Sequence, residues 1–232
     1  MGANYSAAVS TAKDYYDSGD ADNFYYTIWG GEDIHVGLYE SGDEPIFAAS
    51  RRTVTRMAER LRALGRGSRV LDIGAGYGGA ARYLAGTYGC RVDALNLSEV
   101  ENRRGREMNR RQGLDHLVTV VDGSFEDVPA PAESYDVVWS QDAILHSGNR
   151  TTVLREVRLG RKPGGAWVFT DPRSRTTARP GYCSRFWSAS PSSFRTGIRI
   201  TSAWICGASS ICMPSRWRRN FTYCSAQWRR CC

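Results

Sequence analysis

Five short apolar segments alternate with helix-like segments between residues 68 and 172, and this alternation constrains the fold more than any other feature. The apolar segments read SRVLDIG, CRVDALNLS, HLVTVVDGS, SYDVVWSQDAI and GGAWVFTDP. Strands separated by helices of about 10 to 15 residues are typical of a parallel sheet with helices on both faces. The sequence therefore predicts an α/β fold with a doubly wound, mostly parallel sheet, whose ligands bind at the carboxyl ends of the strands.

The first apolar segment runs directly into the glycine-rich stretch DIGAGYGG, residues 72–79. Glycine lets the backbone turn tightly and approach a ligand closely. A nicotinamide fingerprint reads G-x-G-x-x-G, whereas the spacing here is D-x-G-x-G-x-G, with the acid on the strand. This spacing favours a ligand that has no pyrophosphate and that brings a cationic or amino group near Asp72. The alternative is a plain strand–turn–helix corner.

Residues 1–60 precede the alternating region, and we expect them to form a helical lid. Apolar side chains recur at helical spacing between residues 44 and 64, and this spacing predicts a helix that Gly65 ends. Aromatic residues are dense ahead of that helix, and we expect most of them to pack the lid onto the core. Aromatic faces also attract quaternary ammonium groups. Among these aromatic residues, Trp29 is our candidate for a substrate contact.

Residues 173–232 differ in composition from everything before them. They contain 11 Arg and no Asp, Glu or Lys. The whole chain has a net charge of +7, so residues 1–172 have a net charge of −4. They also lack Leu and Val, although they hold four of the seven Trp and six of the seven Cys. A stretch of sixty residues without Asp, Glu, Lys, Leu or Val would arise by chance with a probability on the order of 10⁻¹¹. We therefore treat residues 61–172 as the core and residues 173–232 as a separate, poorly ordered tail.

Three hypotheses account for this tail. Our first is a shift of reading frame near residue 172, because codons for residues 173–188 can be chosen so that a skip of two nucleotides reads QSHDCPPGVLQPVLER. A basic tail with interleaved aromatic residues could instead bind nucleic acid. Its cysteines could bind zinc, but the tail has no C-x-x-C pair. Under the first hypothesis the C-terminal part of the fold is incomplete, and we expect the chain as written to be marginal or inactive.

Residues 25–172 resemble the class I S-adenosylmethionine-dependent methyltransferases, which have a Rossmann-like fold. The resemblance rests on the glycine stretch, on ALNLS, GSFEDVP and SYDVVWSQDAILH, and on the RKPGG turn before the fifth strand. It implies S-adenosylmethionine as cofactor, with its methionine part in the glycine loop, its ribose on Asn96 and its adenine beside Ser124 and Phe125. Asn96 and Ser124 stand where the family usually has Asp. The cofactor-binding residues implied in this way are Asp72, Gly74, Gly76, Gly78, Asn96, Ser124, Phe125 and Gln141.

Two longer motifs, YYTIWGGEDIHVGLYE and WSQDAILHSGNR, look like those of the sarcosine/dimethylglycine N-methyltransferases, which make the osmoprotectant glycine betaine. This resemblance implies a small amine as methyl acceptor, with Trp29, His35 and Asp142 as substrate-side residues. His146 is the catalytic candidate, because it could accept a proton from the amine or orient a carboxylate; the alternative is a histidine that only packs. The reaction needs no metal. Methyltransferases that act on sugar or quinone oxygens share a looser form of the first motif, so an oxygen acceptor stays open.

The remaining features set the expected surroundings. Cys90 is the only cysteine in residues 1–172, which indicates a reducing, cytoplasmic setting. No run of about 18 apolar residues occurs, and the N-terminus lacks a basic start followed by an apolar stretch, so we expect neither a membrane span nor a secretory signal. We expect a small-molecule partner and no nucleic-acid partner; the oligomeric state is left open.

Overall fold

The computed structural model describes residues 5–61, 63–173, 183–189 and 200–204, with side chains described no further than residue 171. Its centre is a sheet in the order β3-β2-β1-β4-β5-β6-β7. The first five strands of that order are parallel, as the alternation predicts. Their bounds are β1 (Arg69–Ile73), β2 (Arg91–Asn96), β3 (Val118–Asp122), β4 (Tyr135–Gln141) and β5 (Arg161–Arg173).

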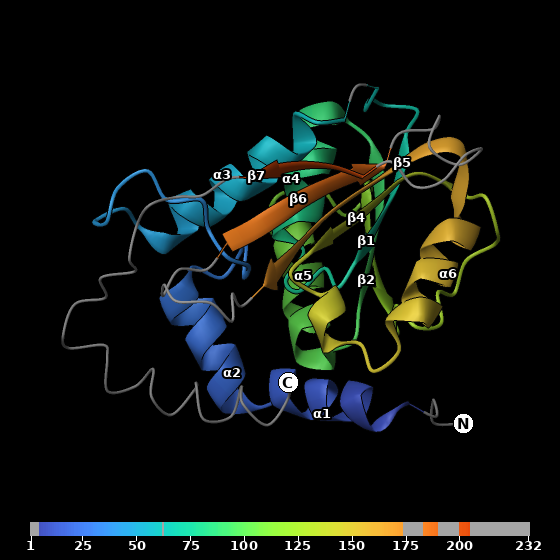
Figure 1. Cartoon of the computed structure of the whole chain (residues 1–232). Coiled ribbons are helices and arrows are strands. Elements are labelled where there is room, and N and C mark those ends of the chain that lie inside the picture. Colours follow the sequence, from blue (N-terminus) through green and yellow to red (C-terminus); the bar gives the residue numbers. More distant parts are fainter. Residues whose placement is uncertain (1–4, 62, 174–182, 190–199, 205–232) are drawn as a thin grey trace.

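Helices cover both faces of this sheet, as expected for a Rossmann-like methyltransferase fold (Figure 1). Side chains of β1 are buried on both faces of the sheet. Val70 packs on one face with α3 and α4, while Leu71 and Ile73 pack on the other face with α6. A strand that is buried on both sides reads as a continuous apolar run, which is the pattern seen in the sequence. The helices after residue 30 are α3 (Ile46–Ala58), α4 (Gly79–Tyr88), α5 (Glu99–Arg111), the short η2 (Ile144–His146) and α6 (Arg150–Gly160).

Residues 7–29 hold the helical part of the lid. It consists of α1 (Ala7–Tyr16), α2 (Gly19–Asn23) and the π-helix η1 (Phe24–Trp29). Ser6 and Ser18 cap the two α-helices, since each side-chain oxygen accepts a backbone N–H one turn later. Tyr25 is buried together with Tyr77 of the glycine stretch, so the lid packs directly over that loop.

Helix α3 ends at Ala58, whereas the sequence predicts that the helix continues to Gly65. Arg60 N–H donates to the Met57 carbonyl oxygen and Leu61 N–H to that of Ala58, so the chain tightens into a turn here. This turn brings Leu61 and Leu64 against the core, where they are partly buried. Tertiary packing therefore ends the helix before the glycine at position 65 does.

The tail contains regular structure that the sequence did not predict. Residues Cys183–Ala189 form β6 and Ile200–Trp204 form β7, and each pairs antiparallel with the strand before it. The described sheet thus has these two antiparallel strands in addition to the five parallel strands that the sequence predicts, and the poorly ordered tail stays a prediction. Strand β6 pairs along the side of β5 that would otherwise present unpaired N–H and C=O groups. The other tail residues, and the nucleic-acid and zinc hypotheses that rest on them, lie outside the described residues.

Candidate functional site

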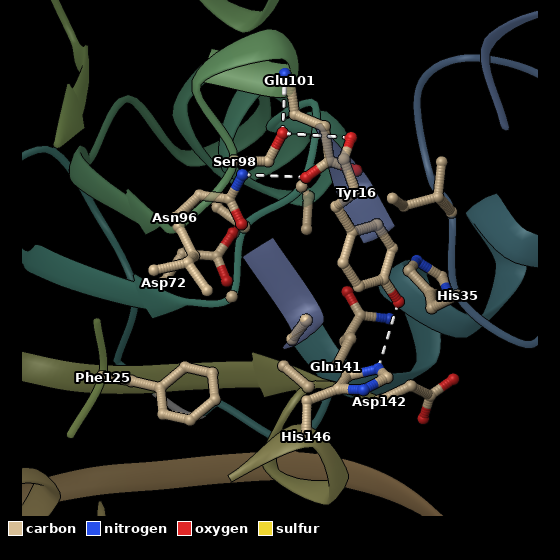
Figure 2. Close-up of a pocket in the computed structure, with 18 of the residues that line it drawn as sticks. Tyr16, His35, Asp72, Asn96, Ser98, Glu101, Phe125, Gln141, Asp142 and His146 are labelled. Atoms are coloured by element: carbon tan, nitrogen blue, oxygen red, sulfur yellow. Dashed lines mark hydrogen bonds between the residues drawn. The ribbon is translucent and has the colours of Figure 1, made fainter. Parts of the chain in front are cut away.

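A pocket lies at the carboxyl edge of the parallel strands, beneath the lid (Figure 2). Its walls come from α1, from residues 32–35 of the lid, from the glycine stretch and from the ends of β2 and β4. The candidate residues that line it are His35, Asp72, Gly74, Gly76, Asn96, Ser124, Phe125, Gln141, Asp142 and His146. Gly78 and Trp29 are not among its lining residues. The structure thus brings ten of the twelve candidates to one place.

The glycine stretch follows β1 and turns sharply into α4. Gly74, Gly76 and Gly78 all have positive φ angles, of 76°, 56° and 80°. Gly74 also has no room for a side chain, because a Cβ there would lie 2.3 Å from the Cβ of Ala143. Gly78 is the left-handed residue before α4, so it shapes the loop without lining the pocket. Both the conformation and the close approach explain why the motif needs glycine here.

Asp72 is the buried acid at the end of β1. Its Oδ2 atom has no hydrogen-bond partner, and the side chain lines the pocket. Burial raises the pKa of this carboxyl to about 8, with a further contribution from the charge of Asp33 on the lid. A carboxyl group held in this way is ready to accept a hydrogen bond or to face a cation.

Asp72→Asn is expected to increase the free energy of unfolding at pH 8 by an amount on the order of 5 kcal/mol. The folded protein keeps a proton on Asp72 up to about pH 8, whereas the unfolded chain loses it near the ordinary aspartate pKa of 3.8. The free energy of unfolding of the wild type therefore falls as the pH rises from about 4 to about 8. The side-chain amide of the variant does not titrate, so the variant does not show this loss. Urea unfolding of both proteins at pH 4.5, 6 and 8 measures the difference, with exposed Asp115→Asn as the matched control. A gain that does not grow with pH would contradict this assignment.

Asn96 and Glu101 form a buried pair where β2 gives way to α5 (Figure 2). The Asn96 Nδ2 donates to Glu101 Oε2 over 2.9 Å, while Glu101 Oε1 has no partner. Burial raises the pKa of Glu101 to about 8. Ser98 and Glu101 fit the S-x-x-E pattern of a capping box, and Ser98 Oγ does accept the Glu101 N–H at 3.1 Å. The Glu101 side chain also lines the pocket, a role that the capping pattern hid.

Ser124 and Phe125 follow β3 and close another side of the pocket. Ser124 is buried, and its Oγ accepts the N–H of Glu126 at 3.1 Å, which fixes the turn after the strand. Phe125 is partly buried against the core cluster on the α6 face of the sheet. A flat aromatic ring on this wall suits an equally flat ligand group.

Tyr16 and His146 meet across the pocket, one from the end of α1 and the other from η2 (Figure 2). The Tyr16 Oη lies 3.1 Å from His146 Nε2, and the two rings meet edge to face. Burial lowers the pKa of His146 to about 4, so the ring is neutral at neutral pH. Burial also raises the pKa of Tyr16, so its hydroxyl keeps its proton, and the tautomer of the neutral imidazole decides which of the two groups donates.

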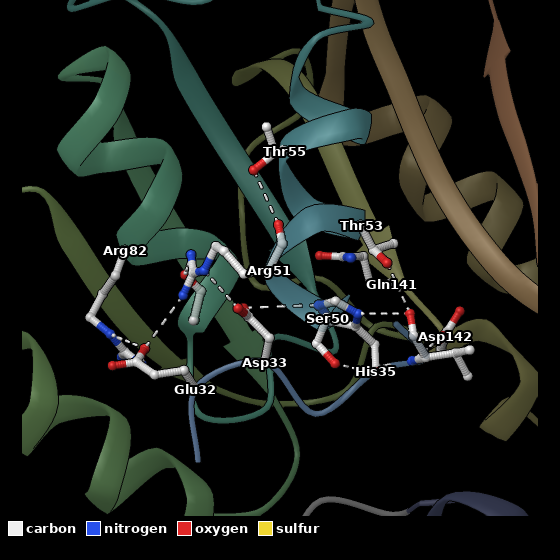
Figure 3. Close-up of polar contacts among 12 residues, drawn as sticks. Glu32, Asp33, His35, Ser50, Arg51, Thr53, Thr55, Arg82, Gln141 and Asp142 are labelled. Carbon is white, nitrogen blue, oxygen red and sulfur yellow. Dashed lines mark hydrogen bonds and ion pairs between the residues drawn. The ribbon is translucent and has the colours of Figure 1, made fainter. Parts of the chain in front are cut away.

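Asp142 ties the lid to the sheet (Figure 3). Its Oδ2 accepts the Val36 N–H of the lid at 2.8 Å, and its Oδ1 accepts the Thr170 hydroxyl of β5 at 2.7 Å. Asp142 also has a φ of 50°, uncommon for a residue with a side chain. Burial raises its pKa and lowers the pKa of His35 beside it, so His35 is neutral. Both carboxylate oxygens of Asp142 are therefore engaged in holding the lid.

A second tie joins the lid to the glycine stretch (Figure 3). Asp33 Oδ2 pairs with the Arg51 Nε of α3 at 2.9 Å, and Arg51 also donates to the Gly79 carbonyl oxygen. Glu32 accepts hydrogen bonds from Arg82 of α4. Burial raises the pKa of Asp33 to about 6, and its Oδ1 is left without a hydrogen-bond partner, 3.9 Å from His35 Nε2.

Trp29 lies in the aromatic layer of the lid and not in the pocket wall. Its ring packs against Phe24 and Tyr25, and its Nε1 donates to the His35 carbonyl oxygen at 3.2 Å. This contact shapes the segment that carries His35. The aromatic ring that does line the pocket from α1 is Tyr16. The sequence missed Tyr16 because several aromatic residues precede it and follow it without a distinguishing pattern.

The described pocket wall is rich in carboxyl groups and has no Lys or Arg among its described lining residues. Its carboxyl groups belong to Glu32 and Asp33, which pair with arginines outside the wall, and to Asp72, Glu101 and Asp142, whose pKa values burial raises. Within residues 5–171, no group of three or more His, Cys, Asp or Glu side chains is arranged to hold a metal ion. Nor does any helix in the described part of the chain have the length and apolar character needed to cross a bilayer. An acidic wall with unpartnered acceptor atoms suits a cationic organic ligand.

Known proteins match this chain in both sequence and fold. Residues 71–169 match the model of a methyltransferase domain. The sarcosine/dimethylglycine N-methyltransferase of Halorhodospira halochloris is 61% identical over 165 residues, which cover 71% of this chain and 59% of that protein. The glycine/sarcosine/dimethylglycine N-methyltransferase of Actinopolyspora halophila is 59% identical over 175 residues, covering 75% of this chain and 31% of that protein.

A solved structure agrees with these relatives. A Galdieria sulphuraria protein proposed to be a sarcosine dimethylglycine methyltransferase superposes with a TM-score of 0.63 at 47% identity, covering 66% of this chain and 60% of that one. The chain thus spans about three fifths or less of the length of these relatives. With its glycine loop, strand order and lid motif, the chain contains a methyltransferase domain of Rossmann-like fold over residues 71–169, and it is similar to the sarcosine/dimethylglycine N-methyltransferases.

Proposed function

We propose that this protein transfers the methyl group of S-adenosylmethionine to the nitrogen of a small amine, sarcosine or N,N-dimethylglycine. The observation that carries the proposal is the acidic pocket over the glycine loop, with unpartnered oxygen atoms on Asp33, Asp72 and Glu101. S-adenosylmethionine has a sulfonium and an ammonium group, and both favour carboxylate surroundings. The three relatives supply the acceptor class, since each is named for methylating these amines or is proposed to do so. Such a reaction contributes to betaine synthesis in a cytoplasmic setting.

Each part of the cofactor has residues suited to hold it. When bound, the cofactor supplies an electrophilic methyl group on its sulfur. The backbone at Gly74 and Gly76 can approach the methionine part closely, and Asp72 lies beneath it. Phe125 offers an aromatic face for adenine, with Ser124 beside it. Gln141 keeps an unpartnered Nε2, since its Oε1 accepts the Trp139 indole N–H at 3.0 Å, so its amide can donate into the pocket.

The acceptor side is organised around Tyr16, His146 and the lid. An amine attacks a methyl group only through a free lone pair, so it has to be in its neutral form. His146, with a pKa of about 4, is too weak a base to take a proton from an ammonium ion at neutral pH. Its role is to hold the Tyr16 hydroxyl, which can orient the acceptor. Asp142 and His35 hold the lid closed over the reacting groups, and positioning accounts for most of the rate.

We further propose that residues 173–232 come from a shifted reading frame. The matches to relatives extend over 165 to 175 residues, close to the 172 residues that precede the change in composition. The pocket supports the same idea, because the described lining residues include no Lys or Arg to pair with the carboxylate of an amino-acid acceptor. In this proposal the natural continuation supplies that cation.

The expected result with the purified 232-residue chain is that it binds S-adenosylhomocysteine at one site, with a dissociation constant in the micromolar range. Isothermal titration calorimetry measures this directly. For the acceptor, a chain with the alternative frame restored is incubated with cofactor labelled in its methyl group and with sarcosine, dimethylglycine, a hexose and a hydroquinone. We expect label on the two amines. Label on the hexose or the hydroquinone alone would favour the oxygen acceptor, and a folded chain that does not bind S-adenosylhomocysteine would contradict the proposed function.

A further inference from the structure

Tyr77 lies in the middle of the glycine stretch, residues 72–79, but its side chain belongs to the lid side of the loop. The ring is fully buried, and it is not among the described residues that line the pocket. It packs with Ala21 and Tyr25 of the lid and meets the ring of Tyr26 edge to face, with 5.8 Å between the ring centres. The loop that borders the pocket is thus joined to the lid by its own tyrosine.

The Tyr77 hydroxyl binds a carboxylate on α2, because its Oη lies 2.9 Å from Asp22 Oδ1. Arg104 of α5 binds the same carboxylate twice, Nε to Oδ1 and Nη2 to Oδ2, each over 2.6 Å. The hydrogen bonds from Arg104 hold the pKa of Asp22 below its usual range, while burial raises the pKa of Tyr77, so the hydroxyl is the donor. A single carboxylate of the lid therefore joins the glycine stretch to α5.

The backbone of Tyr77 provides a second connection to the lid. Its carbonyl oxygen accepts Arg82 Nη1 of α4 at 2.7 Å, and Arg82 Nε donates to Glu32 Oε2 of the lid at 3.0 Å (Figure 3). Helix α5 comes close on another side, since a Cβ on Gly105 would lie 3.2 Å from the same carbonyl oxygen. Any shift of the loop at Tyr77 consequently disturbs contacts with the lid on both sides of η1.

The glycines around Tyr77 make these contacts important for the shape of the loop. Glycine has many accessible backbone conformations, so a glycine-rich loop loses much entropy when it is held in one of them. The contacts of Tyr77 with the lid help to select the conformation that borders the pocket. The lid also forms the wall of the pocket opposite this loop, through Val9 and Tyr16. A ligand between them meets a loop and a lid that each favour the docked position of the other.

We propose that Tyr77 is a positioning residue that couples binding of the cofactor at the glycine stretch to docking of the lid, through its hydrogen bond to Asp22; this inference rests on the proposed function. Tyr77 itself does not contact the cofactor. Because such coupling is reciprocal, a docked lid improves cofactor binding by the same factor by which the bound cofactor favours the docked lid.

The test is made with Tyr77→Phe in the full chain, with S-adenosylhomocysteine as the ligand. Phenylalanine keeps the buried ring and removes only the hydroxyl, and Asp22 Oδ1 retains Arg104 Nε as a donor. By calorimetry we expect the dissociation constant to rise about 10-fold. Hydrogen exchange supplies the second readout. In the wild type we expect the ligand to slow exchange of the amides of residues 19–29 about 10-fold, and in Tyr77→Phe less than about 3-fold.

Tyr135→Phe is the matched control, because Tyr135 makes the same kind of contact far from the pocket. It is buried, and its Oη donates over 2.9 Å to Asp93, which pairs with Arg69 as Asp22 pairs with Arg104. Tyr135 begins β4, whereas the pocket lies at the carboxyl end of that strand. We expect this variant to lose stability as Tyr77→Phe does, but to keep the wild-type affinity and the wild-type protection of the lid.

Two results would overturn the inference while wild-type binding stands. One is an affinity of Tyr77→Phe for S-adenosylhomocysteine that equals that of Tyr135→Phe. The other is a weaker affinity with full protection of residues 19–29 at saturating ligand, which would show that the hydroxyl acts on the loop without the lid. A folded wild-type chain that does not bind S-adenosylhomocysteine would contradict the proposed function itself, so the titration of the wild type separates the two kinds of failure. Thermal unfolding verifies that each variant is folded.

Discussion

A chain in which residues 173–232 are replaced by the translation of the alternative frame is expected to methylate dimethylglycine at least about 100-fold faster than the 232-residue chain. The pocket has acidic and aromatic walls for the cofactor, but its described lining lacks a cation for the carboxylate of the acceptor. An acceptor that is not held in line with the methyl group reacts slowly, even when the cofactor is well bound. Transfer of label from the cofactor to dimethylglycine, followed at saturating cofactor, measures the ratio.

Cofactor binding is the internal control for this comparison. Both chains share residues 1–172, so we expect their dissociation constants for S-adenosylhomocysteine to agree within a few-fold. Nucleotide sequencing of the gene provides a second, independent test of the shifted frame. Equal rates of methyl transfer by the two chains, or an intact frame that encodes this tail in homologous loci, would remove the frame-shift proposal.

Gly74→Ala is expected to destabilise the protein by about 3 kcal/mol and to abolish measurable binding of S-adenosylhomocysteine. Two effects add at this position. The residue has a φ of 76°, which side chains disfavour, and the new Cβ would lie only 2.3 Å from the Cβ of Ala143. Since Ala143 lies in the pocket wall after β4, relief of this clash displaces the wall or the glycine loop. Urea unfolding and calorimetric titration measure the two losses.

The two effects can be separated with variants that the chain itself offers. Gly113→Ala carries a similar φ of 66° with open space around it, so it measures the conformational cost alone, about 1 kcal/mol. The double variant Gly74→Ala/Ala143→Gly removes the clash and is expected to recover the stability lost beyond that cost. If the double variant is no more stable than the sum of its single changes predicts, the close contact is not the cause.

The parallel core could be predicted from the sequence because its signals are local. A strand buried on both faces, such as Val70 to Ile73, reads as an apolar run, and the glycines after it mark the turn. The carboxyl-edge rule then brought ten of the twelve candidate residues to one pocket. These patterns can be recognised from the sequence alone because the residues within each strand or helix specify that element.

The features that the sequence could not reveal depend on contacts between distant segments. Tyr16 is one of many aromatic residues near the N-terminus, and only the approach of η2, 130 positions away, distinguishes it. Glu101 fits a capping pattern, and only the position of Asn96 in three dimensions turns it toward the pocket. Strand β6 pairs with β5 and β7 pairs with β6, and no local pattern in the tail predicts either pairing.

Among the described residues, the lining of the pocket begins at Val9 and ends at His146. A ribosome therefore completes every residue of this wall before it reaches the point where the composition changes. A genetic lesion after that point spares these described lining residues and alters only the residues translated later, among them the proposed cation for the acceptor. Such a product would still be recognised in a cell by its affinity for the spent cofactor, long after it had ceased to turn over an acceptor.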